Sequence, residues 1–210
     1  MTSGGRAPGA DAATSFPIPT LITDRLVLRG FRDEDREPFA ALNADPEVMR
    51  YFVSTLDRVS SDARVDRILD HWRADGHGLW AVERREDGRF LGFTGLAKQD
   101  YLEQPEVGWR FARFAWGHGY ATEAAIASLA WGFEERGYRE VVSVTAVEND
   151  RSRAVMERLG MHRDPADDFL HPHIPEGHPL RRHVLYRLTH QEWAARSRPV
   201  GSRQATTEGT

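Results

Sequence analysis

The period of the hydrophobic positions changes along the middle of the chain and predicts a strand, a loop, a helix and a second strand. EVGWRF (106–111) is typical of a strand that enters a glycine-containing loop. In the stretch after the loop, small and apolar residues recur at 3.6-residue spacing and form one broad helical face. These residues are Ala121, Ala124, Ala125, Ile126, Leu129, Ala130 and Phe133. The β-branched run from Arg139 to Val147 predicts a strand that is covered on both faces.

A short helix is predicted directly after this second strand. Val155, Met156 and Leu159 give it one apolar face, and Gly160 suits the left-handed position just past its end. Further along, residues 183–188 read as a clear strand with a less clear partner before it. A closing helix is expected from about Gln191.

The N-terminal half shows a first strand, a helix and a hairpin. Alternation from Leu26 onward predicts the strand, and either Ser60 or Ser61 suits the N-cap of the helix. Two apolar runs are joined by EDGR (86–89), and Asp-Gly between such runs is a strong hairpin signal. Gly92 and Gly95 within the second run indicate a bulge or the close approach of another backbone.

Length and composition bound the class of protein. The 210 residues are enough for one domain, which we expect over residues 17–196, with a disordered leader (1–16) and a disordered tail (197–210). With 40% hydrophobic and 29% charged residues the chain is typical of a soluble globular protein. No run approaches the roughly 18 apolar residues that span a bilayer, so no membrane partner is expected.

Charge and cysteine content exclude further classes. The formal net charge of −4 gives no electrostatic case for nucleic acid as a partner. The chain has no cysteine, which excludes disulfides, thiolate metal sites and a cysteine acyl-enzyme, and which fits a cytoplasmic location.

Four histidines near the C-terminus raise the question of a metal site. They are His171, His173, His178 and His183. Zinc ligands usually come with fixed short spacings and supporting carboxylates, whereas prolines interrupt the backbone between these histidines. We therefore expect an irregular surface loop and no metal.

The loop AWGHGY (115–120) is the first candidate for chemistry. Gly117 and Gly119 let the backbone turn sharply and leave its N–H groups unobstructed, and the predicted helix begins at once. Free amides and the positive end of a helix dipole then meet, which suits a phosphate group. The loop fits dinucleotide and nucleoside-triphosphate motifs poorly, because Thr122 stands where GxGxxG needs its third glycine and no Lys-Ser/Thr follows.

The order of motifs around this loop resembles a known family. WGHGYATEA, followed about 25 residues later by ENDRSRAVMERLGM, is similar to the GNAT superfamily of N-acyltransferases that use acyl-CoA. TDRLVLRGF followed by DEDREPFAALNAD resembles the start of its RimJ/RimL branch, typified by ribosomal-protein alanine N-acetyltransferases. Met161 replaces the final aromatic residue of the family pattern. The resemblance implies an α+β fold with a mixed, mostly antiparallel sheet of about seven strands flanked by helices.

The resemblance also implies an acetyl-CoA site between the fourth and fifth strands, which splay apart in the family. The pantetheine arm would lie between these strands, and a backbone N–H near Arg110 or Phe111 would polarise the thioester carbonyl. The pyrophosphate would lie on the loop amides, with added positive charge from Arg113 and His118. The expected cofactor-binding residues are Phe111, Arg113, Trp116, Gly117, His118, Gly119, Tyr120, Ala121, Thr122 and Asn149.

Glu106 and Ser152 are the candidate catalytic residues. A carboxylate partly buried beside Val107 and Trp109 should have a raised pKa and serve as the base for the acceptor amine. The alternative for Glu106 is a strand-end carboxylate that pairs with Arg110 or faces solvent. Ser152 would point at the CoA sulfur, or its hydroxyl would simply bond to backbone.

Asn149 has two readings as well. Its amide would hold the pantetheine arm, or it would cap the helix, a position that Asp150 also suits. Tyr51, Phe52 and Trp72 are candidate acceptor contacts, with packing in the core as the alternative.

The function that follows is an acetyltransferase that moves an acetyl group from acetyl-CoA to a primary amine. The amine would belong to a protein N-terminus or a small molecule and would attack directly in a ternary complex. A non-catalytic acyl-CoA-binding or regulatory module on the same fold is the alternative. The chain is expected to act as a monomer or homodimer.

Overall fold

The computed structural model describes residues 17–197. The predicted leader and, apart from Ser197, the predicted tail lie outside these residues. The helices are α1 (Arg36–Ala44), α2 (Arg58–Asp75), α3 (Tyr120–Ala130), α4 (Asp150–Arg158) and α5 (His190–Ser197). The strands are β1 (Leu21–Ile22), β2 (Leu26–Arg29), β3 (Leu79–Arg84), β4 (Phe90–Ala97), β5 (Glu106–Phe111), β6 (Glu140–Ala146), β7 (His162–Arg163), β8 (Phe169–Leu170) and β9 (Arg182–Thr189).

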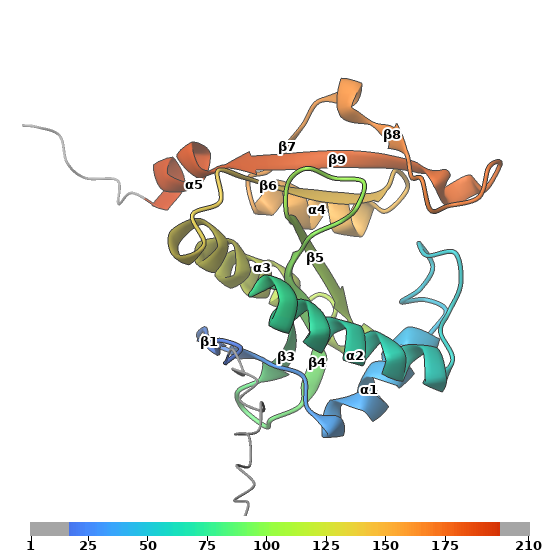
Figure 1. The fold of residues 1–210 in the computed structure, drawn as a ribbon, viewed down its shortest axis with the longest axis vertical. Coiled ribbons are helices and arrows are strands. Elements are labelled where there is room, and N and C mark those ends of the chain that lie inside the picture. The colour runs from blue at the N-terminus through green and yellow to red at the C-terminus, as the bar shows by residue number, and fades with distance from the viewer. Residues whose placement is uncertain (1–16, 198–210) are drawn as a thin grey trace, which may run out of the picture.

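The strands form one mixed sheet, and helices pack against it (Figure 1). The order is β1-β2-β3-β4-β5-β6-β9-β7, and β8 also pairs with β9. The described residues contain nine strands where about seven were expected, because β1, β7 and β8 are two-residue strands. All pairs are antiparallel except β5 with β6, so the predicted α+β fold with a mostly antiparallel sheet is confirmed.

In the β3–β4 hairpin, Gly92 and Gly95 lie where another backbone approaches closely, as the sequence predicts. A Cβ at Gly92 would lie 2.1 Å from the carbonyl oxygen of Arg110, and one at Gly95 would lie 2.2 Å from that of Gly78. A bulge, the other feature that the sequence allowed here, is present as well, because the register between β3 and β4 shifts between Val82 and Glu83. The glycines therefore let β4 lie tightly between its neighbours.

The N-cap of α2 differs from the prediction. Asp57, and neither Ser60 nor Ser61, is the cap, and its carboxylate accepts from the Ser60 N–H at 2.7 Å. Ser61 is instead buried, and its hydroxyl accepts from the side-chain amide of Asn43 on α1 at 2.9 Å. The serine thus joins the two helices rather than beginning one.

Two hydrophobic clusters divide the molecule. The first gathers α1, α2 and β2 to β4, and the second gathers β6, α4 and β9, while α3 contributes to both. Trp109 of β5 and Trp131 at the end of α3 pack against both clusters. In Figure 1, β6 and β9 cross the upper part of the molecule, β3 and β4 lie in the lower part, and β5 lies between them.

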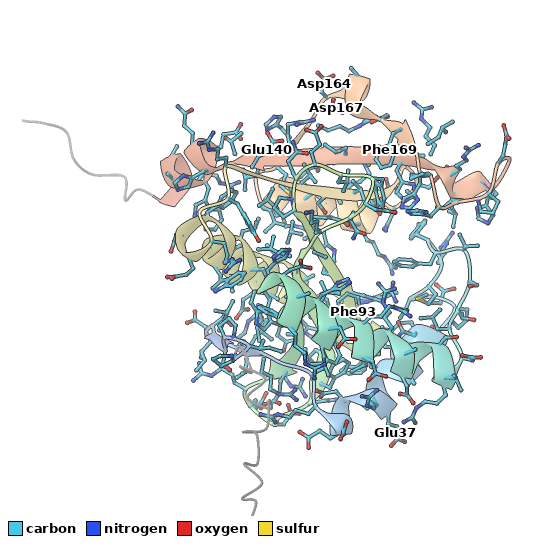
Figure 2. All side chains as sticks on the ribbon, in the orientation of Figure 1. Glu37, Phe93, Glu140, Asp164, Asp167 and Phe169 are labelled. Carbon is cyan, nitrogen blue, oxygen red and sulfur yellow. The ribbon has the colours of Figure 1, made fainter. Side chains whose placement is uncertain are left out.

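The segment between β7 and β9 is fixed to the sheet by charged side chains. Arg187 on β9 donates to Glu140 of β6 at 2.9 Å and to Asp167 at 2.6 Å. Figure 2 labels the two acidic residues. His171 lies 3.1 Å from the Tyr101 hydroxyl and packs on the ring of His183. Within residues 17–197 no group of three or more His, Asp or Glu side chains is arranged to hold a metal ion. None of the described helices is long and apolar enough to cross a membrane.

Candidate active site between β5 and β6

The predicted gap between the fourth and fifth main strands is present between β5 and β6. Within the described residues a single pair, Glu106 with Val142, gives the parallel register between these strands. The Val142 N–H donates to the Pro105 carbonyl at 3.0 Å, so the strands are joined at the start of β5. Beyond Glu106 they diverge, and β6 pairs with β9 along its whole length.

The direction of the β5 amides follows from the ladder. The Ala112 N–H donates to the Leu91 carbonyl next to β4 at 2.9 Å. Because successive amides of a strand point to opposite sides, the Arg110 N–H also faces β4, whereas the Trp109 and Phe111 N–H groups face the gap. Of the two candidate donors to a thioester oxygen, Phe111 is therefore the one whose N–H faces the gap.

The glycine loop has the geometry of an anion site. Gly117 and Gly119 have φ of 79° and 80°, a conformation that favours glycine, and Gly119 directly precedes α3. Within the described chain the N–H groups from Gly117 to Thr122 donate to no carbonyl oxygen, as the first turn of a helix requires. The Trp116 N–H differs, because it donates to the Arg113 carbonyl at 3.1 Å. The amides available to a phosphate group thus begin at Gly117.

A pair that the sequence reasoning missed holds this loop in place. Glu123, in the first turn of α3, accepts from the backbone N–H of Arg25 at 3.0 Å and forms a salt bridge with its guanidinium at 2.6 Å. The same carboxylate accepts from the Thr23 hydroxyl at 2.6 Å. Arg25 also donates to the His118 carbonyl at 2.9 Å. Glu123 therefore connects the glycine loop to the residues that precede β2. Because Glu123 and Arg25 are far apart in the sequence, only the folded structure shows that they are in contact.

The predicted positive charges around the loop are arranged differently from the expectation. Arg113 forms a salt bridge with Asp45 just past α1 at 2.8 Å, so its guanidinium is not brought to the glycine loop. His118 is exposed, and its ring stacks on that of Tyr120. Arg151 of α4, which was not predicted, lies 4.5 Å above the ring of Trp116. A cation from α4 thus reaches the loop from across the gap.

Asn149 and Ser152 separate into two roles. Asn149 is the N-cap of α4: its side-chain oxygen accepts from the Ser152 N–H at 3.3 Å, and its amide donates to the Thr145 hydroxyl at 2.9 Å. The capping alternative therefore accounts for the side-chain oxygen of Asn149, and the bond to Thr145 ties its nitrogen to β6. The Ser152 hydroxyl is partly buried and hydrogen-bonds to no other residue in the part of the chain that the structure describes. It is free to contact a ligand.

Glu106 has the electrostatics of a base. It lies at the closed end of the gap, and its Oε2 accepts from the Gln99 side-chain amide at 2.7 Å. Burial raises the pKa of Glu106 from 4.5 to about 7, against smaller opposing effects of Gln99, the Val144 backbone and the Arg64 charge. Since Glu106 forms no salt bridge with Arg110 or any other described residue, the ion-pair alternative is wrong.

The aromatic candidates for acceptor contacts lie in different environments. Trp72 is 2% exposed and packs against Trp80 and Trp131, so it belongs to the core. Phe52 is 43% exposed, and its ring covers the guanidinium of Arg110 at 4.0 Å. Tyr51 is partly buried beside Arg50. Phe52 and Tyr51 thus remain available for an acceptor, and Trp72 does not.

Comparisons with known proteins agree with this geometry. Residues 25–162 match the model of a family described as an acetyltransferase (GNAT) domain, and the chain belongs to this family. YkkB of Bacillus subtilis, an uncharacterised protein, is 37% identical over 145 residues, which are 68% of this chain and 84% of YkkB. The FsC-acetyl coenzyme A-N(2)-transacetylase of Aspergillus fumigatus is 32% identical over 202 residues, which are 88% of this chain and 82% of the relative.

A solved structure shows the same fold. The acetyltransferase of Agrobacterium tumefaciens superposes with a TM-score of 0.68 at 29% identity and covers 88% of this chain and 99% of its own. Relatives that include a putative ribosomal N-acetyltransferase of Bacillus subtilis agree with the RimJ/RimL-type branch. The class of protein is therefore a GNAT acetyltransferase, and the chain is an enzyme of that family.

Proposed function

We propose that the protein transfers the acetyl group of acetyl-CoA to a primary amine by direct attack in a ternary complex. The observation that carries the proposal is the gap beside β5. It has Glu106 at its closed end, the Phe111 N–H along its wall, and the glycine loop with Ser152 at its mouth. The name of the Aspergillus relative, an acetyl coenzyme A N(2)-transacetylase, supports a nitrogen acceptor.

The loop and the strand would bind the two ends of the cosubstrate. The free amides from Gly117 to Thr122 and the positive end of α3 fit a pyrophosphate, and no Cβ obstructs it at the two glycines. Arg151 adds a positive charge beside Trp116. The Phe111 N–H, whose direction the ladder fixes, would donate to the thioester oxygen and stabilise the negative charge that develops there.

Glu106 would act as the general base and Ser152 as a hydrogen-bond donor to the leaving group. With a pKa near 7, Glu106 is both sufficiently ionised at neutral pH and basic enough to take a proton, directly or through water, from the acceptor's ammonium group, which becomes the nucleophilic amine. The amine nitrogen forms a bond to the carbonyl carbon, and the carbon–sulfur bond then breaks. The free hydroxyl of Ser152 would donate to the departing sulfur, which needs little help because thiols ionise near pH 8.5.

The experiment is a thiol-release assay with acetyl-CoA and a panel of primary amines between pH 5 and 9. The wild-type rate should fall as pH drops through about 7, where Glu106 takes up its proton. Glu106→Gln should be slower and lack this inflection, while its affinity for CoA stays unchanged. Glu103→Gln, an exposed carboxylate in the preceding loop, is the matched control and should keep the wild-type profile.

Two results would contradict the proposal. If Glu106→Gln kept the wild-type pH profile, the base would be another group or water. If acetyl-CoA bound but no amine released the thiol, the protein would be the non-catalytic acyl-CoA-binding module that the sequence left open.

A further inference from the structure

Arg110 carries a buried positive charge without an acidic partner. Its side chain is 6% exposed, and one of its terminal nitrogens donates to the Asn43 side-chain oxygen at 2.5 Å. Its Nε is buried and has no hydrogen-bond partner among the described residues. Within residues 17–197 no carboxylate lies within ion-pair distance of this guanidinium. Burying an ion without a counter-charge is costly, so this arrangement needs a physical reason.

The neighbours of Arg110 hold the guanidinium in place but do not neutralise it. Asn43 is fully buried, and because its amide nitrogen donates to Ser61, its oxygen is directed at Arg110. The rings of Phe52 and Phe93 lie 4.0 and 5.4 Å from the guanidinium carbon. Cation–π contacts and an amide oxygen stabilise a cation without removing its charge.

A second arginine without an ion-pair partner among the described residues, Arg64, lies on α2 one helical turn after Ser61, the residue that holds Asn43. The Nε of Arg64 is also buried without a hydrogen-bond partner in that part of the chain. Arg64 is close enough to lower the pKa of Arg110, which burial and this repulsion together bring to about 9. It is also close enough for its charge to favour the ionised form of Glu106. Two like charges therefore face one region of the protein.

This region is on the same side of β5 as Glu106. Side chains alternate along a strand, so Glu106, Gly108 and Arg110 share one face. Arg110 pairs across the sheet with Phe93, which packs on Phe39 of α1 at 5.8 Å, so this is the face that α1 covers. Four residues of strand, about 13 Å along the backbone, separate the Cα atoms of Glu106 and Arg110. Both side chains are long and extend from the same face of the strand, so one small amino-carboxylate can contact both charged groups.

We propose that the acceptor amine carries a carboxylate group, which Arg110 receives together with Arg64. The inference rests on the proposed acetyl transfer and names its substrate class, an amino acid or a similar amino-carboxylate. A guanidinium presents a planar set of donors that matches a carboxylate in two parallel hydrogen bonds. Polyamines would be repelled by the two arginines, although the net charge of the whole chain is −4.

The test compares free amino acids with their C-terminal amides as acceptors. The members of each pair have the same side chain and differ in the negative charge. Since the carboxylate also raises the pKa of the neighbouring amine, kcat/KM, measured by release of thiol from acetyl-CoA, is expressed per unprotonated amine for both. The wild type should prefer the acids by about tenfold or more, mainly through KM. Arg110→Met should reduce the preference to about one, and Arg64→Met should reduce it in part.

Controls separate this inference from a structural role of Arg110. Arg73 is an exposed residue on α2, the helix that carries Arg64. Arg73→Met removes one positive charge there and should keep the wild-type preference for acids over amides. CoA affinity should be unchanged in every variant, which shows that the fold is intact. Should Arg110→Met be unstable, Arg110→Lys is the substitute; it keeps the charge, loses the paired donors, and should show an intermediate preference.

The outcomes are distinguishable. If the wild type acetylates amides or polyamines as well as the acids, the carboxylate inference is wrong and the proposed acetyl transfer stands. If both arginine variants keep the acid preference, the two arginines do not bind the carboxylate. If no amine is acetylated, the proposed function fails and this inference fails with it.

Discussion

Asn149 and Ser152 lie in the same helical turn, yet the structure gives their side chains different partners. Both polar atoms of Asn149 have a partner, the Thr145 hydroxyl for the nitrogen and the Ser152 N–H for the oxygen, whereas the Ser152 hydroxyl has no partner among the described residues. A side chain that contributes nothing to the fold is a better candidate for a ligand contact than one that caps a helix. A substitution of Ser152 should therefore change mainly the turnover, and a substitution of Asn149 should change mainly the stability.

Ser152→Ala should lower turnover about tenfold and change the free energy of unfolding by less than about 1 kcal/mol. Asn149→Ala should instead cost about 1 kcal/mol of stability, because the first turn of α4 loses its cap. Steady-state acetyl transfer and urea unfolding measure the two effects. Full turnover in Ser152→Ala together with reduced stability would make the hydroxyl a structural group.

Glu106 should make stability depend on pH in an unusual direction. The folded protein keeps the Glu106 proton up to about pH 7, whereas the unfolded chain releases it near 4.5. Between these values the folded state binds more protons, so the contribution of Glu106 to stability is present below pH 4.5 and is lost as pH rises to 7. Most carboxylates in ion pairs behave in the opposite way.

Glu106→Gln should therefore be more stable than the wild type at pH 8 and nearly equal to it at pH 4.5. The difference in unfolding free energy should reach about 3 kcal/mol, which corresponds to the displacement of the Glu106 pKa from 4.5 to about 7. Urea unfolding at a series of pH values measures it, with Glu103→Gln as the exposed control. A difference that does not vary with pH would mean that burial does not raise the pKa of Glu106.

At the scale of elements, local signals predicted most of the fold. The hairpin at EDGR, the strands β5 and β6, the apolar face of α3 and the glycine that ends α4 all depend on residues close in sequence. The cap of α2 shows the limit. Asp57 and Ser60 are both good N-cap residues, but the helix begins at Arg58, so Ser60 lies in its first turn and donates its N–H to Asp57. Ser61 is likewise inside the helix, where it contacts Asn43 of α1.

Some residues of the candidate site also have a local sequence signal, and others do not. The glycine loop, Glu106 and Ser152 are predicted as site residues because they belong to contiguous motifs around one strand and one loop. Arg25 lies 98 residues from Glu123, and Arg110 lies 67 residues from Asn43, so neither pair leaves a local signal. The sequence offers Arg110 only as an alternative partner for Glu106, since it does not reveal that Arg110 is buried beside Asn43 and Phe52 with no carboxylate of the described residues in ion-pair distance. Charge compensation depends on the packed structure.

At the scale of the whole molecule, the gap lies where two hydrophobic clusters meet. β5 and β6 are joined at their starts and then diverge, while Trp109, Trp131 and helix α3 hold the two clusters together behind the gap. A ligand in the gap would contact the glycine loop of one half and α4 of the other. Binding should therefore stabilise the arrangement of the halves as well as the loop, by mass action on the folded state.

Amide hydrogen exchange along β5 should show directly whether acetyl-CoA binds in the gap. The Arg110 N–H is directed at β4 and should exchange slowly in both states, because that ladder does not depend on ligand. The Trp109 and Phe111 N–H groups face the gap, so they should exchange at least about tenfold more slowly once acetyl-CoA supplies acceptors and excludes water. Nuclear magnetic resonance resolves the three amides separately. ATP shares the adenosine and phosphates but has no pantetheine arm, and it should leave all three rates unchanged. Equal protection of the three amides by acetyl-CoA would indicate a general stiffening, and protection of none would place the cosubstrate outside the gap.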